Sequence, residues 1–417
     1  MMQIDQDGVV RVAGFPKGLN NISPESSLPE GALLEAVNVD VLDGGKVRRR
    51  GGFVKKYAGN GIHSFWSKDG KTMFYEGGSL KLLNADLSAT VLATGLMSNK
   101  TVAYANVNGE IYWSNGDITG KINSSGTNEL WGIPMPTKPV ATATAAGGLF
   151  NGIYKIALTF ILDTGEEGGV DSFVYVTVTE GGGILLNGIP ASPDVKITKI
   201  GVYVSAANGE VAYHYADIAT GTSTLSISQS ATLGRALNTQ GYYPFPACEL
   251  LDYTHGSLIG AIGRLLFYSS EMRYRLCRIK KNYIMFTSNI TMIAWVNGGV
   301  YVSNETDTYF MRGNNLDKCE QIPLLPYPAV KGTLVRIPNS NDVAWFSARG
   351  WVKGDQQGNV TNVTEGSMLP DVFVTGAAGF REYNGVRQLV SSMTNSSETN
   401  NMIASDYVNI EVIRKAG

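Results

Sequence analysis

NGGVYVS at residues 297–303 and NDVAWFS at residues 341–347 are two copies of the unit that decides the fold. Each is a turn rich in Gly and Asn followed by a short apolar and aromatic strand, which is the pattern of a β-hairpin. Copies recur about 40 residues apart, close to the length of one four-stranded propeller blade. The other copies are DGKTMFY (69–75), NGEIYWS (108–114), IGRLLFYS (262–269) and a weaker YNGVRQLVS (383–391).

The repeated hairpins predict an all-β fold, and the number of copies predicts a β-propeller with five or six blades. A plain β-sandwich is the alternative, because Gly-containing hairpins occur in every β-protein. Sandwich strands follow one another every 8 to 12 residues, roughly, without a larger repeat near 40. The long period therefore favours the propeller.

The repeat of about 40 residues is interrupted between the second and third copies. The Pro-rich segment PMPTKP (134–139) reads as a stiff linker, and short alternating strands follow it without a helical pattern. This predicts a fibronectin III or immunoglobulin-like β-sandwich inserted into the propeller. The predicted domains are residues 1–60 (N-terminal arm and first strands), 61–137 (first part of the propeller), 138–242 (inserted sandwich) and 243–417 (second part of the propeller).

The composition is turn-rich and lightly charged. Gly occupies 49 of 417 positions, and charged residues make up 17% of the chain. The 34 basic and 36 acidic residues leave a net charge of −2, so the summed field offers little attraction to nucleic acid or to an anionic membrane. The N-terminus lacks the layout of a signal peptide, and no apolar run reaches the roughly 20 residues that span a bilayer. We expect a protein made in a cytosol, without a membrane anchor and with its three cysteines reduced.

Catalytic motifs are missing from the sequence. His63, His214 and His255 do not form HExxH, and neither GxSxG nor a P-loop is present. We therefore predict no enzymatic activity, no cofactor and no metal. A glycosidase needs only two carboxylates, so that possibility stays open. Its candidate carboxylates near the blade strands are Glu76, Asp117, Asp252, Glu271 and Asp307.

Two basic stretches attract attention. VNVDV (37–41), the turn DGG (43–45) and KVRRR (46–50) are predicted to form a hairpin. The charges of KVRRR either face solvent or pair with nearby acids, or they contact carboxylates of a neighbouring subunit, for which Arg is well suited. In RYRLCRIKK (273–281) cations alternate with aromatic and apolar residues, and a protein contact or a solvated strand face is favoured over nucleic acid. The candidate subunit-contact residues are Arg48, Arg49, Arg50, Glu30, Glu35 and Asp40.

The N-terminal region resembles a known family. GLNNISPESSLPEG (18–31), EAVNVD (35–40) and GKVRRRGGF (45–53) look like the opening of the tail nozzle, or tubular hub, proteins of short-tailed bacteriophages, which include the packaged-DNA stabilisation proteins. The resemblance implies a structural virion protein of the tail, assembled in the host cytoplasm. It also implies a homo-oligomeric, six-fold ring below the portal and adaptor proteins, in contact with tail fibres or tailspikes and continuing the DNA exit channel.

The charge balance agrees with that role. Each phosphate neutralised by Lys or Arg adds affinity, so a channel that DNA only passes through should be near neutral. Two alternatives remain open, a carbohydrate- or receptor-binding propeller at the tail tip and a tail-associated glycosidase.

Overall fold

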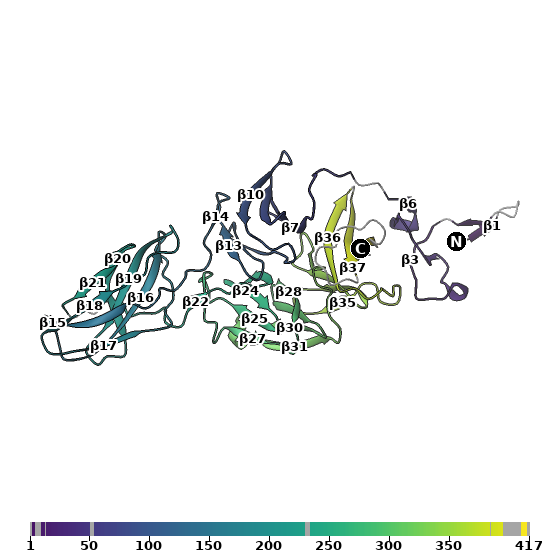
Figure 1. Ribbon diagram of the computed structural model, residues 1–417. Helices are drawn as coiled ribbons and strands as arrows, with labels where there is room; N and C mark the ends of the chain where they lie inside the picture. Colours follow the sequence, from purple (N-terminus) through teal and green to yellow (C-terminus); the bar gives the residue numbers. More distant parts are fainter. Residues whose placement is uncertain are drawn as a thin grey trace. The chain divides into compact units, whose positions relative to one another are not determined.

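The computed structural model describes residues 2–4, 10–12, 14–50, 54–229, 234–383, 385–394 and 410–414 (Figure 1). Over these residues the regular structure is β-strand, apart from three short 3-10 turns: η1 (Glu25–Ser27), η2 (Asp43–Gly45) and η3 (Leu316–Lys318). Contacts divide the chain into two compact units. The first comprises residues 1–102, 261–265 and 285–417, and the second comprises 103–260 and 266–284. No helix of the described residues is long and apolar enough to cross a membrane.

Four-stranded antiparallel meanders dominate the first unit, and each strand pairs with its neighbours in chain order. This is the topology of a propeller blade. The strands are β7 (His63–Lys68), β8 (Lys71–Glu76), β9 (Ser79–Leu83) and β10 (Ala89–Thr94); β28 (Ile290–Val296), β29 (Gly299–Asn304), β30 (Thr308–Arg312) and β31 (Glu320–Leu325); β32 (Val335–Arg336), β33 (Val343–Ser347), β34 (Gly350–Gly354) and β35 (Val360–Asn362). A three-stranded sheet follows, with β36 (Thr375–Tyr383), β37 (Val386–Thr394) and β38 (Ile410–Arg414).

Two further blades involve the second unit. The first contains β11 (Ala103–Val107), β12 (Glu110–Ser114), β13 (Thr119–Ile122) and β14 (Asn128–Glu129); the second contains β23 (Leu250–Thr254), β24 (Ser257–Ile262), β25 (Leu265–Tyr268) and β27 (Tyr283–Met285). A short two-stranded sheet joins β22 (Tyr243–Pro244) to β26 (Leu276–Cys277). The described residues thus contain five four-stranded blades, and the predicted all-β propeller fold is confirmed.

The third sequence copy lies on a different strand of its blade from the other copies. In four blades and in the β36–β38 sheet the repeated motif forms the second strand in chain order, whereas IGRLLFYS (262–269) contains β25, the third strand of its blade. The equivalent second strand is β24, which follows the turn at His255 and Gly256, both at positive φ. The sequence motif matched β25 and not β24 because β25 is the more aromatic of the two strands. Asn384, in the sixth copy, lies outside the described residues.

Successive sheets of the first unit pack face to face. Tyr301 and Phe310 of one blade share a buried cluster with Trp345 and Val352 of the next. A Cβ on Gly354 would lie 2.7 Å from Cζ of the Tyr301 ring, so a larger residue at this position would collide with the ring. A second cluster joins the β33 and β34 side chains to Met368 and to Leu389 and Met393 of β37.

The inserted domain is a two-sheet sandwich, which confirms that part of the predicted fold. One sheet has the order β15 (Val140–Leu149), β18 (Gly182–Asn187), β21 (Thr224–Ile227), and the other has the order β17 (Val174–Val178), β16 (Gly152–Leu162), β19 (Ile197–Ser205), β20 (Ala212–Ala219). Ile156, Leu186 and Val202 are fully buried between the sheets, because alternate residues of each strand face the other sheet. The predicted domain bounds stay predictions.

The N-terminal arm, defined here as residues 14–50, consists of short paired segments. β3 (Gly18–Leu19) pairs in parallel with β4 (Ala32–Leu33), and β5 (Val39–Val41) pairs antiparallel with β6 (Val47–Arg49), as the sequence predicted for a hairpin. The hairpin turn packs against residues 15 and 16. A Cβ on Gly45 would overlap the backbone of these two residues. Before the arm, β1 (Met2–Ile4) pairs with β2 (Val10–Val12).

Candidate functional site: the N-terminal arm and the sandwich junction

The arm has almost no core of its own. Among its described residues Ala32 is the only buried hydrophobic residue, while Val37 is 72% exposed and Val47 42% exposed. Ile22 and Leu34 are exposed as well. A segment of this length in a stable fold normally buries its larger apolar side chains. The arm therefore presents apolar surface that is suited to a protein contact.

The structure brings together two of the six candidate subunit-contact residues. The Arg50 Nε lies 3.2 Å from Asp40 Oδ1, and both side chains are nearly buried. The Arg50 guanidinium also donates to the Val39 carbonyl oxygen. Arg48 lies opposite Asp40 in the register, but its side chain is exposed, as is that of Arg49. Arg50 thus stabilises the hairpin from within, and Arg48 and Arg49 are the cations presented outward. Glu30 and Glu35 are also exposed.

Asn21 anchors the arm to a loop late in the chain, within the first compact unit. Its side-chain Nδ2 donates to the Leu369 carbonyl at 3.1 Å, and its Oδ1 accepts from the Leu369 N–H at 2.7 Å. The Asn21 N–H donates to the Ser367 carbonyl oxygen. The side chain and the backbone of Asn21 together make three hydrogen bonds with residues 367 and 369.

We expect the Asn21→Ala substitution to loosen this anchor. It removes the two side-chain hydrogen bonds, each worth about 1 kcal/mol net, and leaves the backbone bond in place. Hydrogen exchange of residues 18–33 should become several-fold faster, with the blades unchanged. Replacing the exposed Ser26 by Ala is the matched control and should leave exchange as it is. Equal exchange in both variants would show that Asn21 does not hold the arm.

A buried ionic network lies where the inserted sandwich meets the blades of the second unit. The Arg275 side chain is 6% exposed; its Nε lies 2.7 Å from Glu166 Oε2, in the β16–β17 connection of the sandwich. The same guanidinium donates to the carbonyl oxygens of Leu130 and Trp131, just after β14. Arg275 therefore connects the sandwich to the segment that directly follows blade strand β14.

Lys121 of β13 extends the network. Its ammonium lies 2.7 Å from Glu110 and 2.8 Å from Glu129, and Arg275 is 3.6 Å from the same Glu129 carboxylate. Burial of Glu129 disfavours its charged form, but the contacts with Lys121 and Arg275 outweigh that cost and lower the pKa of the carboxyl. The acids and bases of this network satisfy one another.

Aromatic packing surrounds the same point. The Trp131 ring is fully buried and stacks on Phe245 with ring centroids 5.2 Å apart, and its Nε1 donates to the Tyr274 carbonyl oxygen. Tyr112 contacts Trp131 edge-on. The segment before the entry linker therefore packs on the chain that returns from the sandwich, beside Arg275.

The turn GEEGG (165–169) carries the sandwich side of the junction. Glu167 accepts hydrogen bonds from Thr159 Oγ1 at 2.6 Å and Tyr203 OH at 2.7 Å, and lies 2.9 Å from an Arg235 nitrogen. A Cβ on Gly169 would overlap the carbonyl of Tyr242, where the chain leaves the sandwich. The two chain crossings can approach this closely because the position has no side chain.

The basic stretch 273–281 therefore has an intramolecular role. The Arg278 guanidinium lies 4.4 Å from the centre of the Tyr242 ring, and Lys280 pairs with Asp171 at 3.2 Å. The sequence favoured a protein contact or a solvated strand face here, and it did not identify Arg275 as buried. The acidic GEEGG turn was visible in the sequence, but a single sequence does not show that it pairs with this basic stretch.

The three histidines have local partners, and the three cysteines are buried or half-buried. The His63 ring stacks on Tyr75 and contacts Ser64 Oγ and the Ser98 carbonyl oxygen; burial lowers the pKa of His63. His214 contacts Asp217 at 2.7 Å, and His255 contacts Thr254. Cys248 and Cys277 are buried, and Cys319 is half-buried; burial raises the pKa of the Cys277 thiol to about 12.

The glycosidase carboxylates are spread over both compact units. Glu76 pairs with Lys81 at 2.8 Å and accepts from Tyr57, and Asp307 accepts from Thr306 and Tyr309. Both lie in the first unit, whereas Asp117, Asp252 and Glu271 lie in the second. In the part of the chain that the structure describes, no group of three His, Cys, Asp or Glu side chains could hold a metal ion.

The blades and the inserted sandwich define an all-β protein of the propeller class. No protein-family model matches the sequence, and no curated protein matches it. Among solved structures, the chain is similar to virginiamycin B lyase from Staphylococcus aureus, with 12% identity, a TM-score of 0.33, and coverage of 80% of this chain and 92% of the lyase.

Two other propeller structures are similar at the same low level. A gluconolactonase from Xanthomonas campestris has 10% identity and a TM-score of 0.27, covering 78% of this chain and 80% of its own. Hsv2 from Kluyveromyces lactis has 9% identity and a TM-score of 0.28, covering 86% and 97%. Similarities of this size assign no activity to this chain.

Proposed function

We propose that this protein is a structural component of a bacteriophage tail, a ring subunit of the nozzle or hub type whose contacts include the N-terminal arm. The observation that carries the proposal is the arm itself. It is anchored at Asn21, lacks a core of its own, and presents Val37, Val47, Arg48 and Arg49 outward. Its sequence is also the part of the chain that resembles the tail nozzle family.

A closed ring provides a partner for such an arm. In a heterologous head-to-tail contact each subunit offers one surface and receives another, and rotation closes the assembly. The aromatic, Asn-rich and lightly charged composition is compatible with extensive subunit contacts, which are depleted of Lys and Glu in their centres. A net charge of −2 is compatible with a channel through which DNA passes without binding.

Reversing the two outward cations tests the arm contact. The Arg48→Glu, Arg49→Glu double variant should reduce incorporation into phage particles at least tenfold, because like charges would face the carboxylates that the arginines are proposed to meet. Arg312→Glu with Lys318→Glu is the matched control, since both residues are exposed, lie outside the arm and change the net charge equally. Equal incorporation of the two double variants would remove Arg48 and Arg49 from the contact.

The proposal includes the absence of catalysis. Incubation with host-surface polysaccharides should release no new reducing ends above a blank. Turnover that an Asp or Glu substitution abolishes would instead establish a tail-associated glycosidase.

A further inference from the structure

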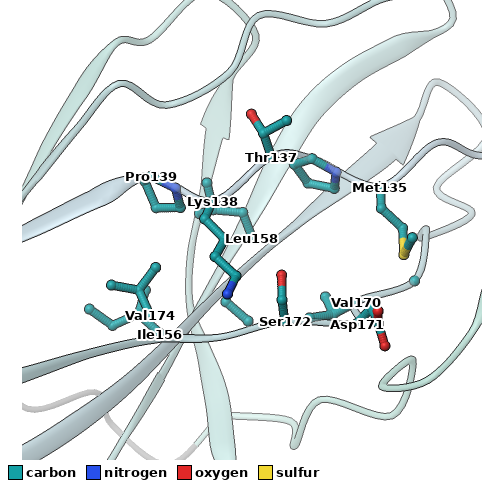
Figure 2. Close-up of a pocket in the computed structure, with 13 residues that line it drawn as sticks. Met135, Thr137, Lys138, Pro139, Ile156, Leu158, Val170, Asp171, Ser172 and Val174 are labelled. Carbon is teal, nitrogen blue, oxygen red and sulfur yellow. The ribbon is translucent and has the colours of Figure 1, made fainter.

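The inserted sandwich contains a cavity at its edge, beside the entry linker (Figure 2). Its volume is about 200 Å³. It is lined by the linker residues 135–139, by Ile156, Ala157 and Leu158 of β16, and by residues 169–172 and 174. Ile156 and Leu158 belong to the core between the sheets, so the apolar side chains available at the cavity are the half-buried Met135, Pro136 and Val174.

An uncovered stretch of strand β16 forms one wall. β17 pairs with β16 from Gly152 as far as Ile156, and pairing on that edge resumes where the Gly168 N–H donates to the Phe160 carbonyl oxygen. Residues two apart on a strand direct their backbone groups to the same side, so the N–H and C=O of Leu158 face this gap. A backbone donor and a backbone acceptor are therefore available to a ligand.

The linker at residues 134–139 does not pair with the free edge of β16, because of its proline residues. Pro136 and Pro139 have no N–H, so the linker cannot continue a ladder along β16 at those positions. On the other side, Gly169 is held against the Tyr242 carbonyl. The walls are set by the junction described above, and the cavity is consequently part of the folded sandwich.

The mouth of the cavity is cationic. Figure 2 shows the Lys138 side chain extending from the linker toward Ser172. Asp171, the acid of this region, is already engaged: the Tyr243 hydroxyl and then Lys280 and Lys138 lower its pKa, and Lys280 lies 3.2 Å away. Two ammonium groups, Lys138 and Lys280, thus surround the single carboxylate of Asp171, and an incoming ligand meets an excess of positive charge.

We propose that this cavity binds a small organic carboxylate. The apolar part of the ligand would lie on Met135, Pro136 and Val174, and the carboxylate would accept hydrogen bonds from Lys138 Nζ, Ser172 Oγ and the Leu158 N–H. An apolar cavity of about 150 Å³ holds a benzene ring, so this one has room for an aromatic or branched aliphatic acid. The proposal is independent of the role of the arm.

Titration of the full chain with three probes of similar size, followed by ligand-observed NMR, tests the proposal: benzoate, benzyl alcohol and benzylamine. Benzoate should bind saturably and at least tenfold more tightly than the alcohol or the amine. Lys138→Gln should weaken benzoate about tenfold and leave benzyl alcohol unchanged. Lys199→Gln, at an exposed lysine of the same sandwich, is the control and should change neither.

A blocking variant gives an independent readout. Ser172→Phe, at the half-buried rim, should abolish binding of all probes while the circular dichroism spectrum stays β-type. Three results would each overturn the site: no saturable binding of benzoate, equal effects of Lys138→Gln and Lys199→Gln, or undiminished binding by a folded Ser172→Phe variant.

Discussion

Replacing Arg275 by Leu should lower the free energy of unfolding by about 3 kcal/mol. The change leaves the Leu130 and Trp131 carbonyl oxygens without their donor in a buried site, at about 1–3 kcal/mol for each unsatisfied group. It also leaves Glu129 with Lys121 as its remaining close partner in the buried part of the network. Removing one member of a buried ion pair is costly because the other stays desolvated.

Urea denaturation of the full chain, followed by tryptophan fluorescence, measures this effect. Lys280→Leu is the matched control, since the Lys280–Asp171 pair is largely exposed and such pairs are worth about 0–1 kcal/mol. Hydrogen exchange should rise at residues 130–135 and 163–169 in the Arg275 variant alone. If both variants unfold at the same urea concentration, Arg275 does not hold the junction.

Deleting residues 1–45 should abolish incorporation of the protein into phage particles. The deletion removes the Asn21 anchor, the β5 strand and the exposed Val37, and it leaves β6 without its partner strand. The blades keep their own sheets, so the truncated chain should remain folded. The readout is the amount of the protein in purified particles and the fraction of particles that retain packaged DNA.

Deleting residues 1–13 is the control for chain shortening, because the arm begins after them. This shorter deletion should be incorporated better than the longer one. Normal incorporation of the 1–45 deletion, with normal DNA retention, would contradict the proposed role of the arm.

The blades could be predicted from sequence because each hairpin is local. A Gly or Asn turn and the apolar strand after it are consecutive in the chain, so NGEIYWS (108–114) and NDVAWFS (341–347) identify β12 and β33 directly. The hairpin at residues 39–49 was predicted for the same reason. The alternation of the sandwich strands and the Pro-rich linker placed the insertion.

The junction could not be predicted, because its partners are far apart in sequence. Arg275 and Glu166 are separated by 109 positions, and no local pattern marks one as the partner of the other. The cavity depends on a gap in pairing along β16, which is set by where β17 starts and not by the residues of β16 themselves. The third sequence copy matched β25 and not β24, because aromatic content alone does not determine the position of a strand within its blade.

Electron cryomicroscopy of the intact phage particle tests the proposed ring. Its map should show copies of the chain in a closed, six-fold ring on the tail axis below the portal and adaptor, with the arm of each subunit lying on its neighbour. A map in which the protein is missing from the tail, or in which it lies on the axis as a ring whose arms contact no other subunit, would contradict it.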